Sequence, residues 1–409
     1  MTTDLNARLA ALSPRQRDLL RSRLAAARQE RPAEPGTAQR ATAEQATAQQ
    51  QRGDLGWSLF FFSAESDVPI RETYELVMES ARFADTHEFE AVWLPERHFD
   101  SFGAPFPNPA LLASAIGTAT ESVEVRAGSV VLPLHDPLYI AENWAVLDNL
   151  TGGRTGVSLA SGWHINDFVT APENYERRRE ILAEGVATLR TLWAGETIRR
   201  TNGSGQEIDV AAFPLPTRPI PLWLTVTSRP DTWQLAGRLG MNVLTALLEQ
   251  TVDEVAERIA LYRQARQEAG HTSLGRVTLM VHTHLADDRA RAHDRIRGPL
   301  TRYLRQHMEL FAKYARGKDL GFDVDSVSEA DKAALAAMAF DRYVNTSGLF
   351  GSAESVLPMV TKLTEAGVDE LGCLIDFGAS KEVVLDGLTH LDRLRLLWAE
   401  REDAQCPPS

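Results

Sequence analysis

The sequence predicts an α/β fold in which eight parallel strands, each followed by a helix, close into a (β/α)8 TIM barrel. Short apolar runs alternate with helix-length segments from residue 57 onward, and there are eight such runs. Most runs are nearly continuous apolar stretches, as expected of strands buried on both faces. A doubly wound open sheet is the alternative, but Phe61-Phe62-Ser63-Ala64 follows the first run where a dinucleotide site would have its glycine pattern.

The predicted elements alternate along the whole body of the chain. Strands are expected at residues 57–62, 91–94, 123–132, 155–160, 221–227, 242–247, 276–285 and 370–376. Helices are expected at 71–87, 108–121, 137–150, 173–193, 230–239, 252–270 and 381–400, with a long helical stretch after residue 287. Two insertions interrupt this pattern, a polar, Gly-rich hairpin or loop at 196–213 and a charged helical segment at 287–368. We expect them after strands four and seven, where they would cover the catalytic face.

The first 56 residues differ from this body. Ser13 and Pro14 form a helix start, and leucines follow at helical spacing, which predicts a short amphipathic helix at 13–27. Residues 37–51 show no apolar periodicity and are expected to form a flexible linker. The helix either serves a partner or packs back on the body. The predicted domains are an N-terminal helix and linker at 1–56, a barrel at 57–400 and a tail at 401–409.

Composition excludes several functional classes. Forty-three Lys and Arg against 56 Asp and Glu give a net charge of −13, which disfavours nucleic acid and anionic membranes as partners. The two cysteines, Cys373 and Cys406, lack metal-site spacing and are expected to be inert thiols of a reducing compartment. The sequence has no apolar run long enough for a membrane span, and its polar start does not resemble a signal peptide. A cytoplasmic protein is therefore expected.

The loop after the second predicted strand carries Glu96, Arg97 and His98 at consecutive positions. Barrel enzymes place their chemistry on the loops that follow the strands. A carboxylate, a guanidinium and an imidazole there can control one another's protonation and donate to a developing oxyanion or peroxide. The alternative is an ion pair that merely fixes the loop. We favour a functional role because three polar residues between Leu94 and Phe99 would otherwise be costly.

The loops after strands four and five predict an anion site. Strand four ends at Ser161-Gly162-Trp163-His164, and Arg178 lies among three arginines that open the next helix. Thr227 and Ser228 immediately precede a helix, whose N-terminus favours anions. Ordinary N-capping by these hydroxyls, together with a solvated arginine face, is an equally good interpretation. A second possible anion site is residues 376–380, after strand eight.

Two other chemistries are disfavoured. His282 and His284 lie two apart on one strand and could bind a metal, but no carboxylate-rich set completes the site, so we expect no metal. One or both could instead contact an aromatic ligand. Glycoside hydrolysis needs two acids across the cleft, and strands four and seven do not end in Asp or Glu.

Ordered motifs between residues 57 and 395 resemble the bacterial luciferase-like flavin monooxygenases, specifically the branch associated with nonribosomal peptide and polyketide natural products. These motifs include Ala91-Val-Trp-Leu-Pro-Glu-Arg-His-Phe99, Ser129-Val-Val-Leu-Pro-Leu-His-Asp-Pro137, Asn149-Leu-Thr-Gly-Gly-Arg154, Ser161-Gly-Trp-His164, Ala171-Pro-Glu-Asn-Tyr175, Asn242-Val-Leu-Thr245 and Gly367-Val-Asp-Glu370 leading to Cys373-Leu-Ile-Asp-Phe-Gly378.

The resemblance implies an oxidoreductase that uses O2 and reduced FMN delivered by a flavin reductase. The flavin hydroperoxide must be shielded from water, which gives the insertions a purpose. The resemblance favours Ser161, Arg178 and Thr227, with Gly162 and Ser228 beside them, as the phosphate site, over the strand-eight site. Residues 127–129 would lie against the isoalloxazine edge, so Ala127 and Ser129 are predicted cofactor-binding residues. Glu96, after strand two, is also predicted to bind the cofactor.

The sequence departs from the luciferases at one position. They have Glu-His-His-Phe after strand two, whereas Arg97 stands at the place of the first His and His98 matches the second. We hypothesise that Arg97 or His98 donates a hydrogen bond to the distal peroxide oxygen, assisted by His135 and His164.

The branch also implies a substrate and partners. The substrate would be an acyl or aminoacyl group on a carrier protein, and the enzyme would hydroxylate it or insert oxygen beside its carbonyl. The N-terminal helix would be the element that docks the carrier protein. A homodimer is expected through the helices that flank strands two and three. Alternatives are an F420-dependent reductase or dehydrogenase of the same fold, and a non-catalytic flavin-binding subunit.

Overall fold

The structure is a computed structural model that describes residues 54–63, 68–101, 103–247, 250–317, 340–341 and 343–405, without the side chains of 307–317, 403 and 405. The chain divides into two units, residues 1–53 and 54–409, and the second contains all described residues. The predicted N-terminal helix and linker and Cys406 lie outside the described residues.

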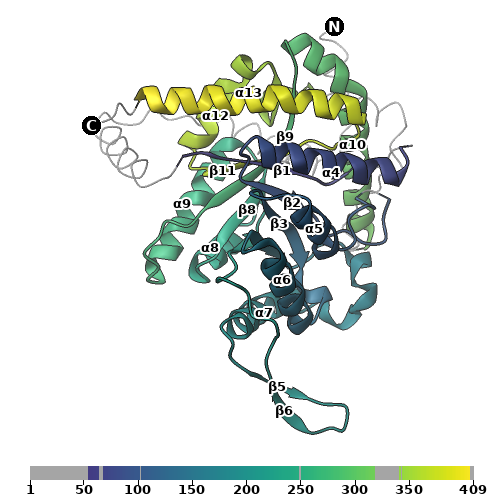
Figure 1. Cartoon of the computed structure of the whole chain (residues 1–409), viewed down its shortest axis with the longest axis vertical. Helices are drawn as coiled ribbons and strands as arrows, with labels where there is room; N and C mark the ends of the chain where they lie inside the picture. Colours follow the sequence, from purple (N-terminus) through teal and green to yellow (C-terminus); the bar gives the residue numbers. More distant parts are fainter. Residues whose placement is uncertain are drawn as a thin grey trace, which may run out of the picture. The chain divides into compact units, whose positions relative to one another are not determined.

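Eight parallel strands close into a barrel, which confirms the predicted fold (Figure 1). The strands run in the order β1, β2, β3, β4, β7, β8, β9, β11, and β11 pairs with β1 to complete the ring. Their bounds are Gly56–Phe60 (β1), Ala91–Leu94 (β2), Glu124–Val131 (β3), Thr155–Ala160 (β4), Leu222–Thr225 (β7), Asn242–Ala246 (β8), Val277–Leu285 (β9) and Glu370–Leu374 (β11). Almost every strand residue is buried, as the continuous apolar runs predict.

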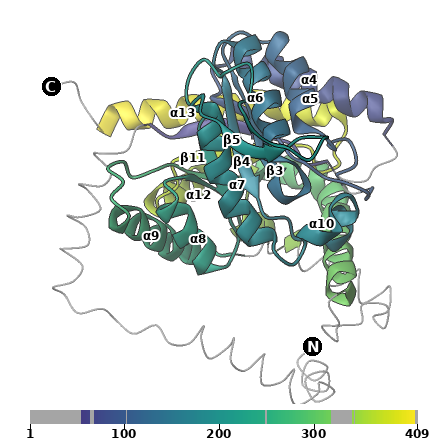
Figure 2. The same cartoon turned by 90° about the horizontal axis from the view of Figure 1, so that it is seen from below.

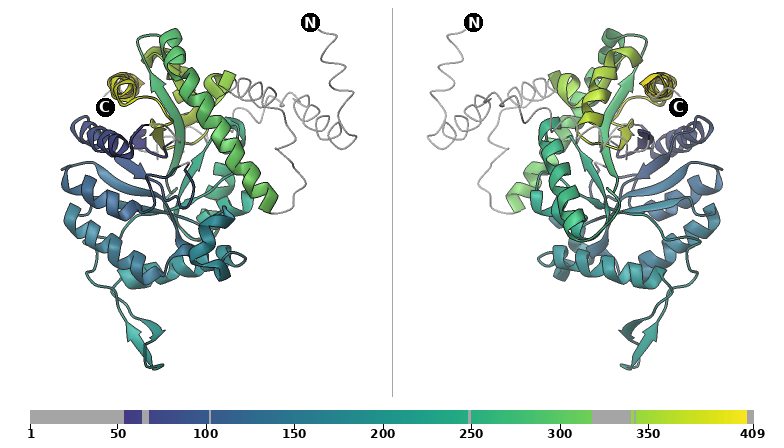
Figure 3. Two further views of the ribbon diagram at one scale, coloured as in Figure 1. Left: turned by 90° about the vertical axis from the view of Figure 1, so that its right-hand side faces the viewer. Right: turned by 90° about the vertical axis from the view of Figure 1, so that its left-hand side faces the viewer.

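Helices surround the strands (Figure 3). They are α4 (Ile70–Thr86), α5 (Pro109–Thr118), α6 (Pro137–Thr151), α7 (Arg178–Trp193), α8 (Pro230–Arg238), α9 (Val252–Glu268), α10 (Arg289–Gly317), α12 (Ala353–Glu365) and α13 (Lys381–Gln405). Several begin at caps that the sequence encodes locally, such as the Thr251 and Glu254 capping box of α9. Helices α8 and α9 pack side by side (Figure 2), and Gly237 permits this contact because a Cβ there would lie 2.4 Å from the Tyr262 carbonyl oxygen.

Two apolar cores lie on opposite faces of the strands. The larger core packs the outward side chains, such as Val92 and Leu94, against the helices. The smaller core fills the barrel interior with inward side chains such as Trp93, and helix α10 adds Leu300 and Tyr303 to it. Helix α10 follows β9, so the insertion after strand seven packs against the side chains of the barrel interior, where a cover is expected.

The other parts of the insertions differ from the prediction. Strands β5 (Ile198–Thr201) and β6 (Glu207–Val210) form the predicted hairpin, which stands between α7 and β7, after strand four as expected. It extends away from the barrel (Figure 1), so it does not cover the strand ends. The segment 287–368 is not entirely helical, because β10 (Gly348–Gly351) pairs in parallel with residues 282–285 of β9.

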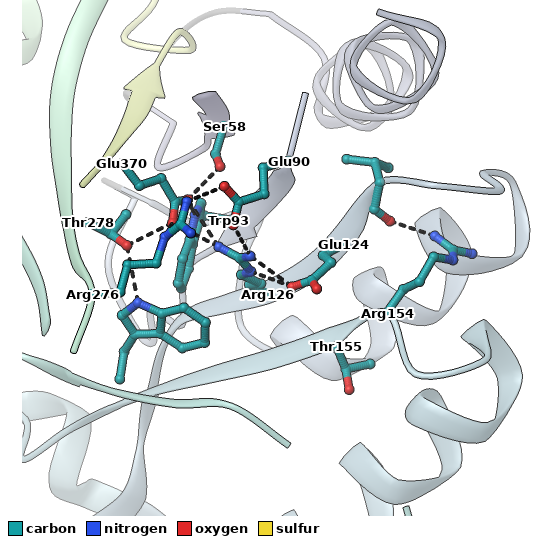
Figure 4. Close-up of polar contacts among 12 residues, drawn as sticks. Ser58, Glu90, Trp93, Glu124, Arg126, Arg154, Thr155, Arg276, Thr278 and Glu370 are labelled. Carbon is teal, nitrogen blue, oxygen red and sulfur yellow. Dashed lines mark hydrogen bonds and ion pairs between the residues drawn. The ribbon is translucent and has the colours of Figure 1, made fainter. Parts of the chain in front are cut away.

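A buried charge cluster lies inside the barrel near the amino-terminal ends of the strands (Figure 4). Glu370, the first residue of β11, accepts hydrogen bonds from Arg126 NH1 at 2.9 and 3.1 Å and from Arg276 Nε at 3.0 Å. Glu90 accepts from Arg126 NH2 at 2.6 Å. Because catalysis in such barrels occurs at the opposite end of the strands, we assign this cluster to stability.

Hydroxyl and indole groups complete the coordination of Glu370. Ser58 Oγ donates at 2.5 Å, and Trp93 Nε1 and Thr278 Oγ1 each donate at 2.9 Å. Burial alone would raise the pKa of Glu370, but the positive charges of Arg126 and Arg276 outweigh it and lower the pKa to about 2. The carboxylate is therefore ionised throughout the neutral range.

No helix in the described part of the chain is long and apolar enough to span a bilayer. Cys373 is buried in β11, and this burial raises the pKa of its thiol to about 12, which agrees with an inert thiol.

Candidate active site

Glu96 joins the loops that follow β2 and β3. Its Oε1 accepts hydrogen bonds from His98 Nε2 at 2.8 Å and from His135 Nε2 at 2.5 Å. Its Oε2 accepts the backbone N–H of Val131, the last residue of β3, at 2.6 Å. The structure therefore brings together three predicted site residues, Glu96, His98 and His135.

This arrangement shifts the pKa of two of its members. Burial alone would raise the pKa of Glu96, but hydrogen bonds from His135 and His98 outweigh it and hold the pKa below its usual value. The hydrogen bond to Glu96 raises the pKa of His98, against the opposing effect of burial. His98 therefore carries a proton to higher pH than a free imidazole does.

Arg97 and His164 meet at a second carboxylate, Asp167, in the 3-10 turn after β4. Arg97 NH1 donates to both oxygens of Asp167, at 2.9 and 2.6 Å, and His164 Nδ1 lies 3.3 Å from the same carboxylate. Arg97 is only 4% exposed, and its Nε and NH2 groups are buried without a hydrogen bond to any described residue. The guanidinium thus keeps the N–H groups of two nitrogens for a ligand oxygen.

Local structure holds Arg97 in this position. Its backbone N–H donates to the Phe106 carbonyl at 2.9 Å, and its guanidinium lies 5.7 Å from the centre of the Trp163 ring. Gly103 adopts a φ of +85°, and a Cβ there would lie 2.8 Å from Arg97 Cγ. The loop backbone therefore closes tightly around the arginine.

Arg178 meets the backbone of Gly162, which follows Ser161 at the end of β4. Arg178 donates through Nε to the Gly162 carbonyl at 3.2 Å and through NH1 to the Tyr175 carbonyl at 2.5 Å, and it stacks over the Tyr175 ring at 4.3 Å. Gly162 has a φ of +73°, and a Cβ there would lie 2.8 Å from Val131 Cγ1. These contacts fix Arg178 beside the strand end through its Nε and NH1 groups. Its NH2 group remains for a ligand.

The start of α8 lies near this arginine cluster. A hydrogen bond from Arg229 is the main reason that the pKa of Asp231, in the first turn of α8, is lowered, and the charge of Arg179 lowers it further. The N-cap of α8 is Arg229 and makes no side-chain capping hydrogen bond. Capping of this helix by Thr227 or Ser228, the alternative interpretation of these hydroxyls, is therefore wrong. These two residues instead hold neighbours through their carbonyls, which accept from Trp233 Nε1 at 2.6 Å and Arg258 Nε at 2.9 Å.

The structure corrects the prediction for Ala127. Its side chain is buried in the core between β3 and the helices, so it points away from the barrel interior. Gly128 faces inward, and a Cβ there would lie 2.8 Å from Phe60 Cζ and 3.2 Å from Trp93 Cε3. Ser129 follows at a bulge in β3, where the Gly128–Ser129 peptide is cis. The backbone of Gly128, rather than the side chain of Ala127, faces the interior.

The loop after β11 is occupied by contacts within the protein. The Asp376 carboxylate accepts the backbone N–H groups of Phe62 and Ser63, both at 2.8 Å, and burial raises its pKa to about 7. Ser380 accepts from the Val383 N–H at 3.4 Å at the start of α13. An acidic group at the start of this loop disfavours the second predicted anion site.

His282 and His284 do not converge on one point. His282 contacts Tyr303 and Phe377 and shares a hydrogen bond with Tyr343 at 3.1 Å, so its aromatic partners belong to the chain itself. His284 lies against Gly387 of α13, and burial lowers its pKa to about 4. The described residues contain one group with metal-ligand proximity, Glu96, His98 and His135, in which Glu96 Oε1 instead accepts hydrogen bonds from both imidazoles.

Comparison with known proteins shows to which family the chain belongs. The model of the luciferase-like monooxygenases matches residues 54–370. The chain belongs to this family. The chain is 22% identical over 76% of its length to the oxygenase component of flavin-dependent trigonelline monooxygenase from Acinetobacter baylyi, covering 86% of that protein. It is 28% identical over 71% of its length to 4-hydroxyprotoasukamycin monooxygenase from Streptomyces nodosus subsp. asukaensis, covering 76% of it.

Solved structures share the fold of this luciferase-like protein. The oxygenating constituent of 3,6-diketocamphane monooxygenase from Pseudomonas putida, in complex with FMN, superposes with a TM-score of 0.66 at 19% identity, covering 83% of this chain and 96% of that one. F420-dependent enzymes also match, among them a hydroxymycolic acid dehydrogenase of Mycobacterium tuberculosis. The family therefore includes both flavin monooxygenases and F420-dependent dehydrogenases.

Asp167 is the site residue that sequence reasoning missed in this luciferase-like chain. It stands in the Asn166-Asp167-Phe168 segment, directly after the predicted loop, but nothing in its spacing indicates a contact with Arg97, 70 residues earlier. A buried arginine needs an acidic partner, and that requirement is the signal that could have prompted a search for one.

Proposed function

We propose that the chain is the oxygenase of a two-component flavin monooxygenase that uses reduced FMN and O2. The observation that carries this proposal is the buried Arg97, whose two unused donors lie at the carboxyl ends of the strands beside two imidazole–carboxylate pairs. Such fixed donors stabilise negative charge that develops on oxygen. Diffusible reduced FMN would come from a separate reductase, in line with relatives named as an oxygenase component and an oxygenating constituent.

The residues present fit FMN. Its phosphate would be held by Ser161, Arg178 and the hydroxyls of Thr227 and Ser228, next to the N-terminus of α8, where no side chain caps the helix. Its ring would lie beside Ser129 in the carboxyl-terminal half of β3, because Phe60 and Trp93 already occupy the space in front of Gly128. Bound reduced FMN supplies the electrons that activate O2.

The residues of the chain have distinct roles in this proposal. Arg97 orients and stabilises the oxygen through Nε and NH2, and Asp167 fixes the guanidinium by accepting from NH1. His98 moves a proton at the reacting oxygen, with His135 on the same carboxylate. His164 supports the Asp167 carboxylate from 3.3 Å. Helix α10 excludes water through its packing on the barrel interior.

Rapid mixing of the reduced-FMN enzyme with aerated buffer tests the proposal. We expect a slowly decaying spectral transient that differs from both reduced and oxidised FMN, because the site is dry and supplies donors. An F420-dependent dehydrogenase would instead change F420 absorbance with an alcohol and show no such transient. A non-catalytic binding subunit would let the flavin reoxidise at the rate of free FMN. Either of the last two results would contradict the proposal.

Replacing Arg178 by alanine is expected to weaken FMN binding by about 10- to 100-fold, because a hydrogen bond to a charged group contributes about 1.5–3 kcal/mol. Binding of riboflavin, which lacks the phosphate, should change little. Fluorescence titration with both ligands measures the ratio. The matched control is Arg177→Ala, because Arg177 is 61% exposed and pairs with Glu180. Equal losses for FMN and riboflavin would place the phosphate elsewhere.

For the substrate we propose an acyl or aminoacyl group, held on a carrier protein and oxidised beside its carbonyl in natural-product biosynthesis. The support is limited to the motif resemblance and to a relative named as a monooxygenase of 4-hydroxyprotoasukamycin. Deleting residues 1–50 and comparing turnover of carrier-bound and free acyl substrates tests the docking role. Unchanged turnover of the carrier-bound form would remove the docking element from the account.

We also propose a homodimer that pairs through α5 and α6, which pack side by side. Leu111 on α5 is 74% exposed and Leu150 on α6 is 56% exposed, so this pair of neighbouring helices offers apolar side chains that a partner could cover. Light scattering should give twice the chain mass of 45.2 kDa for the wild type and the single mass for a Leu111→Lys, Leu150→Lys variant. Ile208→Lys on the hairpin is the control. A monomeric wild type would contradict the pairing.

A further inference from the structure

Glu96 makes all its contacts within the protein. Its side chain is 1% exposed, its Oε1 receives two imidazole Nε2–H groups, and its Oε2 receives the Val131 N–H. With both oxygens used, the carboxylate is poorly placed to bind a ligand directly. The sequence predicts a direct contact between Glu96 and the cofactor, and the burial of this side chain instead favours a role that acts through its partners.

We propose that Glu96 is a positioning residue that couples His98 and His135 through one shared carboxylate oxygen and holds His98 as the proton donor of the site. The coupling itself stands on the hydrogen-bond geometry. Only the destination of the proton, the reacting oxygen, rests on the proposed function.

The geometry determines the path of the proton. Each imidazole donates through Nε2 to the same carboxylate oxygen, so the other ring nitrogen of His98 is the atom that gives up a proton. Imidazolium then becomes neutral imidazole, and no electrons move. The His98 side chain is 18% exposed, so solvent can return the proton to its ring. The carboxylate stays ionised because hydrogen bonds hold the pKa of Glu96 low.

The charged groups around the pair define the sign of the effect. The hydrogen bond and charge of Glu96 raise the pKa of His98, the charge of Asp167 raises it further, and burial and Arg97 lower it. Asp136 adjoins His135 and lies 3.7 Å from Arg200. Removing the negative charge of Glu96 must therefore lower the pKa of His98, whereas removing the competing imidazole of His135 must raise it.

Nitrogen-15 NMR titration of the histidine rings tests this coupling, with His98 assigned through the His98→Asn variant. In Glu96→Gln we expect the His98 midpoint to fall by about 1 pH unit or more, the usual effect of losing an adjacent opposite charge. In His135→Gln we expect it to rise. The matched control is Glu354→Gln on α12. Glu354 pairs with Arg393 and has no contact with His98, so this variant should leave the His98 midpoint unchanged.

Two results would overturn the proposal. An unchanged His98 midpoint in folded Glu96→Gln would show that the carboxylate does not control the imidazole. If that variant does not fold, an unchanged or lowered midpoint in His135→Gln is equally decisive against the shared oxygen. The titration uses neither FMN nor O2, so a failure of the proposed oxygenase activity is distinguishable from a failure of this coupling.

Discussion

Replacing Arg97 by methionine is expected to slow the reaction of enzyme-bound reduced FMN with O2 by about 100- to 1,000-fold, the usual cost of removing a fixed donor to a developing oxygen charge. Methionine fills a similar volume but has no donors. Stopped-flow oxidation of the bound flavin over a range of O2 concentrations measures the rate constant, so the assay needs no organic substrate.

Two further variants separate catalysis from folding at this position. Arg97→Lys keeps the charge but presents a single donor group, so a partial loss is expected. Arg199→Met on the hairpin removes an exposed arginine, 63% exposed and paired with Asp209, and should leave the rate unchanged. A folded Arg97→Met enzyme that reacts with O2 at the wild-type rate would remove Arg97 from the mechanism.

Replacing Glu370 by glutamine is expected to lower the free energy of unfolding by about 3–5 kcal/mol, because it leaves the buried Arg126 guanidinium without its main counter-charge. Arg126 is 3% exposed, so water cannot compensate. Urea unfolding followed by circular dichroism measures the loss. Glu354→Gln is again the matched control, because an exposed ion pair contributes about 0–1 kcal/mol.

The same residue makes stability depend on pH in a defined direction. The pKa of Glu370 is about 2 in the folded protein and lies near 4.5, the ordinary value for a glutamate, when the chain is unfolded. Its contribution is therefore fully present above pH 4.5 and is lost as the pH falls toward 2. The Glu370→Gln variant should show a smaller loss of stability across this window than the wild type. An equal loss in both proteins, or a Glu370→Gln variant as stable as the wild type, would contradict the assigned role.

Repetition made the barrel predictable from sequence. The strands Ala91–Leu94 and Thr155–Ala160 were predicted to the residue, because buried parallel strands are short apolar runs with polar ends. The eighth strand was predicted two residues too long, because Asp376 turns back to bind the Phe62 and Ser63 amides. Helix α7 begins five residues later than predicted, because Pro172–Asn174 forms a separate 3-10 turn.

The chemistry between distant residues was not predictable in the same way. Loop position alone indicated Glu96, Arg97, His98 and His164, because all follow strand ends. Their pairing into two carboxylate-centred groups depends on how β2, β3 and β4 lie side by side, which no local spacing encodes. The Glu370 cluster joins residues from across the chain for the same reason, and no single segment of sequence marks it.

The most direct test of the central claim is an anaerobic calorimetric titration of the full chain with dithionite-reduced FMN. We expect saturable uptake of one FMN per barrel, because the proposed phosphate site at Arg178 and the β3 end at Ser129 would together hold a single flavin. No uptake of FMN in either the reduced or the oxidised form would contradict the claim that this barrel is a flavin-using oxygenase.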